Sequence, residues 1–410
     1  MNSGDTAWIL ISTALVFTMT IPGLAFFYGG LVRRKNVLSI FMQCFTIVAI
    51  IAIQWVIYGY SLAFGPDWGL GILGNLDWLG LKNVGGKPLA DYSGTIPHTL
   101  FMLFQCMFAI ITPALMIGAF AERMKFSAFI PFIILWSTLV YDPLAHWVWG
   151  AGGWMKSLGG LDFAGGIVVH ASSGVSALVI CLLLGKRTGY LKEPFRPHNL
   201  PYTVLGGSLL WVGWFGFNAG SALGANEIAT HAFITTVIAP SAAGLTWAII
   251  EWYKNGKPTI LGTVTGALAG LVAITPACGF VNIMNSIIIG ITASAICYLF
   301  VIKIKNGLGY DDSLDAFGIH GVAGIWGTIA TGLFAEKAVN TAGADGLFFG
   351  GAQLIPQLIM ALVAPIYAAL VTFLIYKIVD AVLGLRVKEK DETIGLDLTQ
   401  QGEAAYTVIE

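Results

Sequence analysis

The sequence predicts an all-α integral membrane protein with eleven transmembrane helices. Of its 410 residues, 57% are hydrophobic and only 10% are charged, whereas soluble domains carry about 25% charged residues. Apolar runs long enough to cross a bilayer, roughly 20 residues, recur along the whole chain. The basic residues gather in alternate connections between these runs, which is typical of a multi-pass protein.

Eleven apolar runs account for the predicted helices. They lie at 8–31, 38–64, 97–119, 127–149, 163–185, 202–222, 229–252, 260–277, 283–302, 317–335 and 349–379. The first run has no basic region ahead of it. We therefore expect it to remain as a spanning helix and not to be removed as a signal peptide.

The distribution of Lys and Arg predicts the orientation of these helices. Seventeen of the 21 basic residues fall in one set of connections and the C-terminal region, and only Lys82, Lys87, Lys156 and Lys337 fall in the other. Because basic loops face the cytoplasm, the C-terminus is predicted to be cytoplasmic and the N-terminus to lie outside. Residues 1–385 then form a membrane domain, and residues 386–410 form a polar cytoplasmic tail that we interpret as regulatory.

Two similar stretches predict an internal repeat. They read "DFAGGIVVHASSG" and "DAFGIHGVAGIWG", and each places a histidine, His170 or His320, four residues before a glycine. They end the fifth and tenth apolar runs. Because five is odd, two such copies, at about 8–185 and 202–335, are predicted to form an inverted repeat with the functional site between them. The helix at 349–379 falls outside the repeat.

The two histidines are the main candidates for a function. Ionisable groups within a bilayer are costly and usually functional, although a single histidine is often a neutral residue bonded to a helix neighbour. One possible chemistry is axial ligation of haem. The other is a narrow pore lined by two imidazoles that share a proton. The Gly- and Ala-rich surroundings favour the pore, and haem stays open as the alternative.

Carboxylates and aromatic residues supply the further candidates. Asp162 and Asp315 lie near the starts of the two histidine helices, where a carboxylate can cap free N–H groups. Trp149 ends the fourth run, near the predicted outer surface. A cluster of such rings at a pore mouth can hold a small cation. The other members of this set are Phe104 and Phe108, four apart on one helical face, and Trp214, Phe217 and Ser221, within two turns.

Composition excludes several other classes of site and partner. The five cysteines have neither zinc-site nor disulfide spacing. The formal net charge of −1 gives no electrostatic basis for binding nucleic acid. We expect no metal and no cofactor, and a transporter in place of an enzyme.

Long motifs resemble those of one known family. The stretch "DFAGGIVVHASSGVSALVICLLLGKR" resembles the signature of the ammonium transporter (Amt/Mep/Rh) family. "FYGGLVRRKNVLS", "GFNAGSA" and "DDSLDAFGIHGVAGIWGT" resemble further blocks of the same family. "GLDLTQQGEAAY" resembles the tail of its Amt branch. The resemblance covers essentially the whole chain.

This resemblance implies a fold, an activity and a set of roles. It implies a homotrimer in a prokaryotic plasma membrane, with one ammonium or methylammonium pore in each eleven-helix subunit. It implies a PII-type signalling protein as a partner at the cytoplasmic face. The implied roles are paired pore histidines at His170 and His320, a phenylalanine gate at Phe108 and Phe217, an outer recruitment site at Trp149, Ser221 and Phe108, and pore-lining or supporting residues at Trp214, Asp162 and Phe104.

The expected mechanism follows from the chemistry of ammonium. A bare charge is unfavourable in an apolar constriction, but ammonium can leave its proton and enter as ammonia, whereas potassium has no such route. Whether the proton also crosses is open. Two alternatives from other classes are an ammonium sensor that signals through the tail and, more remotely, a haem-binding redox protein.

Overall fold

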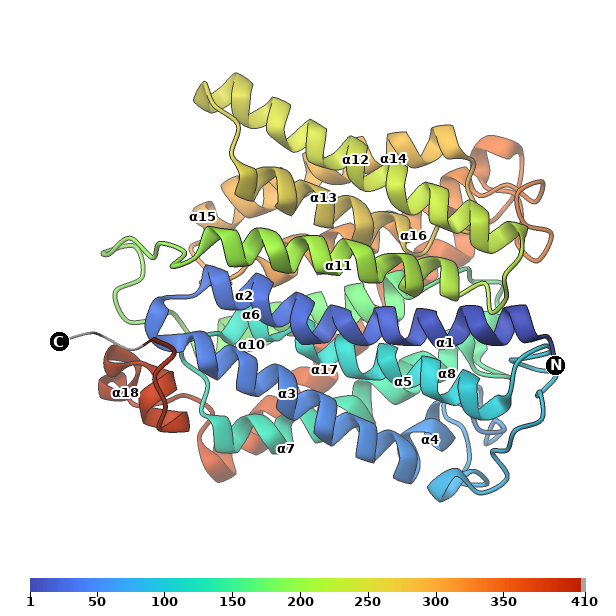
Figure 1. Cartoon of the computed structure of the whole chain (residues 1–410), viewed down its shortest axis with the longest axis horizontal. Helices are drawn as coiled ribbons and strands as arrows, with labels where there is room; N and C mark the ends of the chain where they lie inside the picture. Colours follow the sequence, from blue (N-terminus) through green and yellow to red (C-terminus); the bar gives the residue numbers. More distant parts are fainter. Residues whose placement is uncertain (407–410) are drawn as a thin grey trace.

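The computed structural model describes residues 1–406 and is all-helical there, with only three isolated β-bridges within that part. The last four residues of the predicted tail, 407–410, lie outside it. Helices run side by side along the longest axis of the molecule (Figure 1). The N-terminus and α18 lie at opposite ends of this axis (Figure 1).

The first half of the chain forms ten α-helices, several of which continue through π-helical turns. The α-helices are α1 Ser3–Thr18, α2 Ala25–Leu31, α3 Val37–Gln54, α4 Tyr60–Phe64, α5 His98–Leu115, α6 Ile117–Phe120, α7 Phe126–Trp136, α8 Asp142–Trp149, α9 Trp154–Ser157 and α10 Ser172–Leu184. The π-helical turns are η1 Met19–Leu24, η3 Trp55–Gly59, η5 Ser137–Tyr141 and η6 Gly166–Ala171, and short 3-10 turns are η2 Arg34–Asn36 and η4 Leu79–Leu81.

The second half of the chain also consists of α-helices and short π-helical and 3-10 turns. Its α-helices are α11 Leu200–Gly220, α12 Glu227–Asn255, α13 Ile260–Ile274, α14 Ile283–Tyr298, α15 Lys305–Leu308, α16 Val322–Phe334, α17 Leu354–Leu383 and α18 Glu389–Ile394. The π-helical turns are η7 Leu299–Ile304, η8 Phe317–Gly321 and η10 Asp397–Gln401, and η9 Leu347–Phe349 is a 3-10 turn.

Every predicted apolar run coincides with helix in the structure. Within residues 1–406, nine helical segments are long and apolar enough to cross a membrane. They are Ser3–Leu31, Arg34–Phe64, His98–Phe120, Phe126–Ser157, Gly166–Leu184, Glu227–Asn255, Ile283–Leu308, Phe317–Phe334 and Leu354–Leu383. The two remaining runs correspond to α11 and to α13, a shorter apolar helix of 15 residues. The prediction of a multi-pass membrane fold is confirmed.

Small residues bring the two histidine helices into direct contact. A Cβ atom added at Gly174 of α10 would lie 2.0 Å from the backbone nitrogen of Gly321, and one added at Gly324 of α16 would lie 2.7 Å from the carbonyl oxygen of Gly166. Only glycine permits such close approach of two helix backbones. The glycines that follow the two histidines in the sequence, Gly174 and Gly324, therefore allow the two helices to pack closely.

The described part of the tail folds back onto the loops at one end of the bundle. Its backbone pairs with the loop before α7, where Lys125 N–H donates to Leu385 O at 2.8 Å and Val387 N–H donates to Arg123 O at 3.0 Å. The Glu392 carboxylate accepts from Thr188 N–H at 2.6 Å. The tail thus contacts loops that lie far from it in sequence.

Two further bonds join the tail to the start of α3. Asp397 accepts a hydrogen bond from Ser39 N–H at 2.7 Å, and Asn36 accepts one from Leu396 N–H at 2.8 Å. A carboxylate at this place satisfies an N–H group that has no partner within the helix. The tail therefore completes the N-terminus of an intramembrane helix.

Candidate functional site

The two candidate histidines occupy matching positions. His170 lies near the end of the π-helical turn η6, which runs directly into α10, and His320 lies near the end of η8, which runs directly into α16. Both side chains are buried, with 1% and 7% of their surface exposed. π-Helical turns inside α-helices are frequent at functional sites.

The imidazoles of this pair contact each other. Their Nδ1 atoms lie 3.3 Å apart, and the rings are nearly parallel, at 13°, with centroids 5.3 Å apart. In a pair of neutral rings, one Nδ1–H donates and the other Nδ1 accepts. The Nε2 atom of His170 is buried and has no hydrogen-bond partner within residues 1–406.

Trp214 covers the ring of His170. Its ring stacks on that imidazole at 17° with centroids 5.3 Å apart, and its Nε1–H donates to Thr275 Oγ1 at 2.9 Å. This bond fixes the orientation of the indole, because Nε1–H is its only donor. Trp214 from α11 therefore restricts the place that His170 can occupy.

Two phenylalanines stack beside this pair. Phe108 from α5 and Phe217 from α11 lie with centroids 4.3 Å apart at 29°, and Phe217 is 5.9 Å from the His170 ring. Phe104 meets the ring of Phe108 edge-on at 5.1 Å. All three rings are fully buried. The structure therefore brings the sequence-predicted aromatic residues together.

A cavity of about 190 Å³ adjoins the phenylalanine pair, and we call it the aromatic cavity. Phe108, Trp149 and Ser221 are among its lining residues. Trp149 is held by a bond from Nε1–H to Asp162 O at 2.9 Å. Ser221 donates its hydroxyl proton to Phe217 O at 2.8 Å, which leaves its oxygen lone pairs as acceptors.

A second cavity, of about 250 Å³, adjoins His320, and we call it the histidine cavity. Its lining includes Asp315 and Ser313 as well as apolar side chains such as Phe27 and Ile319. The aromatic cavity and the histidine cavity are lined by different residues. Phe108, one of the stacked phenylalanines, lines the aromatic cavity, and His320 lines the histidine cavity.

Carboxylates hold the N-terminal ends of both histidine segments. Asp162 accepts hydrogen bonds from the backbone N–H groups of Gly165, Gly166, Ile167 and Val168 at 2.6–3.2 Å. The prediction that Asp315 caps the second segment is wrong. Asp312 does so, because it accepts from the N–H groups of Ala316 and Phe317 at 3.1 and 2.8 Å.

Asp315 instead pairs with Lys305 at the edge of the histidine cavity. The stretch "DDSLD" offers three carboxylates. Asp315 itself has a positive φ of 61°, which turns the chain immediately before η8. The cap therefore comes from three residues earlier than the sequence spacing suggested.

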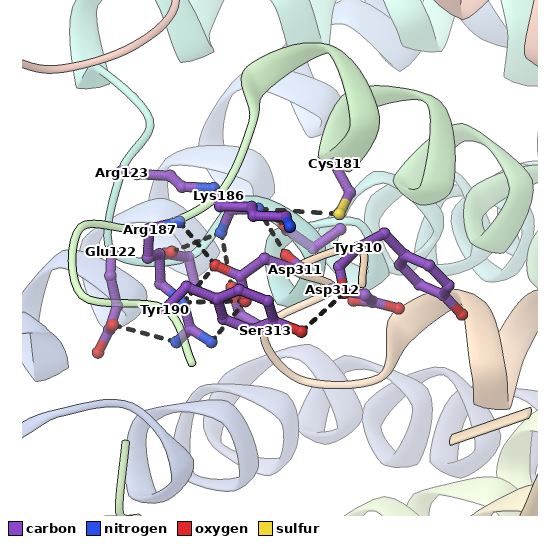
Figure 2. A network of polar contacts seen from close by, with 12 residues as sticks. Glu122, Arg123, Cys181, Lys186, Arg187, Tyr190, Tyr310, Asp311, Asp312 and Ser313 are labelled. Carbon is purple, nitrogen blue, oxygen red and sulfur yellow. Dashed lines mark hydrogen bonds and ion pairs between the residues drawn. The ribbon is translucent and has the colours of Figure 1, made fainter. Parts of the chain in front are cut away.

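Sequence reasoning missed a buried charge network formed by Glu122, Arg123, Arg187 and Asp311 (Figure 2). Arg187 contacts Asp311 at 2.7 Å and Glu122 at 3.1 Å. Arg123 donates to carbonyl oxygens of Ala119, Gly185 and Asp311. These residues follow apolar runs in the sequence. Charged residues at such positions usually belong to solvated loops, so the sequence did not indicate that they are buried.

The charges in this network stabilise one another. Burial opposes ionisation of Asp311, but the hydrogen bonds and charge of Arg187 outweigh burial, so the pKa of Asp311 lies below its ordinary value. Its neighbour Asp312 behaves differently, because burial and the charge of Asp315 raise its pKa to about 6. The network joins the loops that follow α6 and α10 to the loop that leads into η8 (Figure 2).

The ring contact bears on the haem alternative. Axial ligands must point at an iron atom from opposite faces of a macrocycle. The two Nδ1 atoms instead point at each other at hydrogen-bonding distance, which leaves no space for an iron between them. The geometry therefore argues against ligation of a haem iron between these two atoms.

Comparisons with known proteins agree along the full length of the chain. The model of the Ammonium Transporter Family matches residues 7–406. The chain is 56% identical to an ammonium transporter of Bacillus subtilis (strain 168), with 99% of each chain covered. It is 48% identical to ammonium transporter Amt1 of Archaeoglobus fulgidus, with 99% and 100% covered. The crystal structure of Saccharomyces cerevisiae Mep2 superimposes with a TM-score of 0.89 at 38% identity, covering 95% of this chain and 89% of that one.

Proposed function

Because this chain belongs to the ammonium transporter family, we propose that it carries ammonium across the membrane by separating it into ammonia and a proton. The observation that carries this proposal is the contact between His170 and His320, at 3.3 Å, in a buried setting behind stacked phenylalanines. Neutral imidazoles offer polar contacts to ammonia without placing a fixed charge in the apolar region.

The aromatic cavity is the proposed recruitment site. The ring faces of Phe108 and Trp149 attract a cation, and the Ser221 oxygen accepts one of its N–H bonds. Potassium would be attracted by the same faces. Recruitment alone therefore gives little selectivity for ammonium over potassium. The barrier that excludes potassium must lie beyond the aromatic cavity.

The stacked Phe108 and Phe217 are the proposed gate. Transferring an ion past two buried rings is unfavourable by several kcal/mol even after relaxation of the surroundings. Neutral ammonia avoids most of this cost. A neutral pair with one Nδ1–H between its rings can accept a proton from one side and release one on the other, so the pair is also the proposed path for any proton that crosses.

Trp214, Asp162 and Phe104 are proposed to support this pore and not to bind ammonium. Asp162 holds four backbone N–H groups at the start of η6, and Trp214 is anchored by Thr275. Both therefore act on the position of His170. Phe104 packs edge-on against Phe108 and restrains the gate.

The proposed setting is a plasma membrane crossed eleven times, with the N-terminus outside and the tail in the cytoplasm. The basic loops, at the same end of the molecule as α18, support this orientation. We propose an inverted repeat at about 8–185 and 202–335, a membrane domain of residues 1–385 and a regulatory tail of residues 386–410. We also propose a homotrimer with a separate pore in each subunit and a PII-type partner at the cytoplasmic face.

Proteoliposomes that contain the purified protein test this proposal. We expect ammonium and methylammonium to generate flux, and potassium to generate none above that of empty liposomes. Equal passage of potassium and ammonium would contradict separation of the proton. Absence of ammonium flux from a correctly folded protein would instead favour the sensor alternative.

A further inference from the structure

A lysine lies in the aromatic cavity and has no part in the mechanism above. Lys156, in α9, is one of the residues that line this cavity together with Phe108, Trp149 and Ser221. Its Nζ donates a hydrogen bond to the carbonyl oxygen of Trp149 at 3.1 Å. The same nitrogen lies 5.7 Å from the centroid of the Tyr92 ring.

The head of this side chain has the chemistry of the proposed substrate. A lysine carries a primary ammonium group, which differs from methylammonium only in its longer carbon chain. Its two partners, a carbonyl oxygen and an aromatic face, are the groups that bind ammonium ions in proteins. The cavity rim therefore forms a cation subsite from Tyr92 and the Trp149 carbonyl, and this chain fills that subsite with its own lysine.

We propose that Lys156 is a tethered cation that competes with ammonium for the aromatic cavity and sets the affinity of recruitment. This proposal rests on the proposed function, in which the cavity recruits ammonium. A fixed positive charge in the same cavity repels a second cation, and it occupies acceptors that the second cation could use. Asp91 also lines the cavity, and its carboxylate offsets part of this repulsion.

The size of the effect follows from Coulomb's law. Two unit charges a few ångströms apart at a protein surface interact strongly enough to change affinity about threefold to tenfold. Because Lys156 is exposed, salt screens this interaction. The difference between a variant without the charge and the natural protein should therefore shrink as ionic strength rises.

The test compares Lys156→Met with the natural protein and with two controls. Methionine keeps an unbranched side chain of similar length and removes the charge. Lys156→Arg keeps the charge at the same place. Lys82→Met removes the same charge from the same predicted side of the membrane, at a residue outside the cavity lining.

Two measurements are made on each protein in liposomes. Methylammonium binding is followed by tryptophan fluorescence, which does not require transport, and initial methylammonium uptake gives KM and the maximal rate. We expect Lys156→Met to tighten binding and lower KM about threefold to tenfold, with the maximal rate within about twofold. Lys156→Arg and Lys82→Met should match the natural protein, and Asp91→Asn should weaken binding.

The outcomes separate this proposal from the proposed function. Unchanged or weaker binding in a Lys156→Met protein that keeps the unfolding temperature of the natural protein would overturn the role of Lys156. Equal tightening in Lys82→Met would overturn it as well, because the effect would then be one of general surface charge. Binding without any uptake in the natural protein would contradict transport and leave the binding comparison to decide the role of Lys156.

Discussion

The Nδ1 atoms of His170 and His320 lie 3.3 Å apart across two nearly parallel rings. A hydrogen bond between two neutral rings at this contact requires one Nδ1–H donor and one Nδ1 acceptor. Addition of a second hydrogen at this contact would set two donors against each other. The contact can therefore hold one hydrogen between the two rings, as the proposed function requires.

The first prediction concerns this pair. His170→Ala and His320→Ala remove the shared hydrogen bond and should slow ammonium flux. His170→Asp places a carboxylate in the pore. To the extent that this group ionises, it should attract hydrated cations, and selectivity against potassium should weaken while ammonium flux persists. Paired ammonium and potassium currents on supported membranes measure both effects. Natural flux and selectivity in all three variants would mean that the rings are structural.

A second prediction concerns an acid outside the pore. Gln54 donates from Nε2 to Oδ2 of Asp142 at 2.8 Å, and the other oxygens of both groups, Gln54 Oε1 and Asp142 Oδ1, are buried without partners within residues 1–406. A proton on Asp142 Oδ1 would supply the donor that Gln54 Oε1 lacks, because a carboxylic acid and an amide can bond reciprocally.

Asp142→Asn should therefore be tolerated, since its amide supplies an N–H donor at the same place. We expect its loss of stability to stay below about 1 kcal/mol. Gln54→Leu leaves the Asp142 carboxyl without a partner and should cost about 1–3 kcal/mol. Thermal unfolding in detergent shows which of the two variants loses more stability. A greater loss in Asp142→Asn than in Gln54→Leu would show that the acid is ionised and bound elsewhere.

A third prediction gives a pH dependence to the loop before η8. Burial and the charge of Asp315 raise the pKa of Asp312 to about 6, above the ordinary value of 3.8. The folded protein therefore binds more protons than the unfolded chain between pH 3.8 and about 6, and the contribution of Asp312 to stability falls as pH rises through this window.

Asp312→Asn keeps an acceptor for the N–H groups of Ala316 and Phe317 and removes the titration. The shift of this pKa from 3.8 to about 6 limits the full difference to about 3 kcal/mol. We expect the stability of this variant relative to the natural protein to increase between pH 4 and pH 7. Unfolding temperatures measured across this range, with Asp77→Asn as an exposed control, check the sign. A constant difference would show that Asp312 does not titrate there.

A fourth prediction concerns the tail. Truncation before Val387 removes Glu392, which bonds to Thr188 and Arg386, and it removes the cap that Asp397 gives to α3. These contacts involve loops and the start of α3 at one end of the helix bundle. We expect the oligomer to persist while the transport rate changes. Glu392→Gln is the milder variant and should change transport in the same direction.

Size-exclusion chromatography in detergent and methylammonium uptake in liposomes test this separation. An intact oligomer with altered uptake is the expected result. Dissociation of the oligomer in the truncated protein would show that the tail is required for assembly, and unaltered uptake would show that it does not control the pore.

The sequence predicted the helices and the proximity of the candidate site residues more fully than it predicted the contacts of the loops. Apolar runs and alternating basic loops depend on local composition, so they can be read directly. The repeat of His and Gly also identified His170 and His320, although the distance between their rings depends on how α10 and α16 pack. The cap from Asp312 was missed because "DDSLD" holds three equivalent carboxylates, and a turn at Asp315 decides among them.

The buried charge network was missed for a different reason. Arg187 and Asp311 are 124 residues apart, and charged residues after a helix give no indication of a distant partner. His98 and His146 are buried as well. His98 bonds to Tyr60, and His146 bonds to Ala63 and Asp67. Burial of such groups depends on pairing across the fold, which periodicity does not encode.

The cap that Asp397 supplies to α3 has a consequence for biosynthesis. Ser39 and Asp397 are separated by 358 positions, and a ribosome that adds about 5–20 residues per second needs about 20–70 s to cover them. During this interval the third helix is already made, but the start of that helix has not met its final partner. The end of the bundle at the start of α3 is therefore completed by residues that are translated much later than α3. A nascent chain that stops before Asp397 leaves the Ser39 N–H group without this partner.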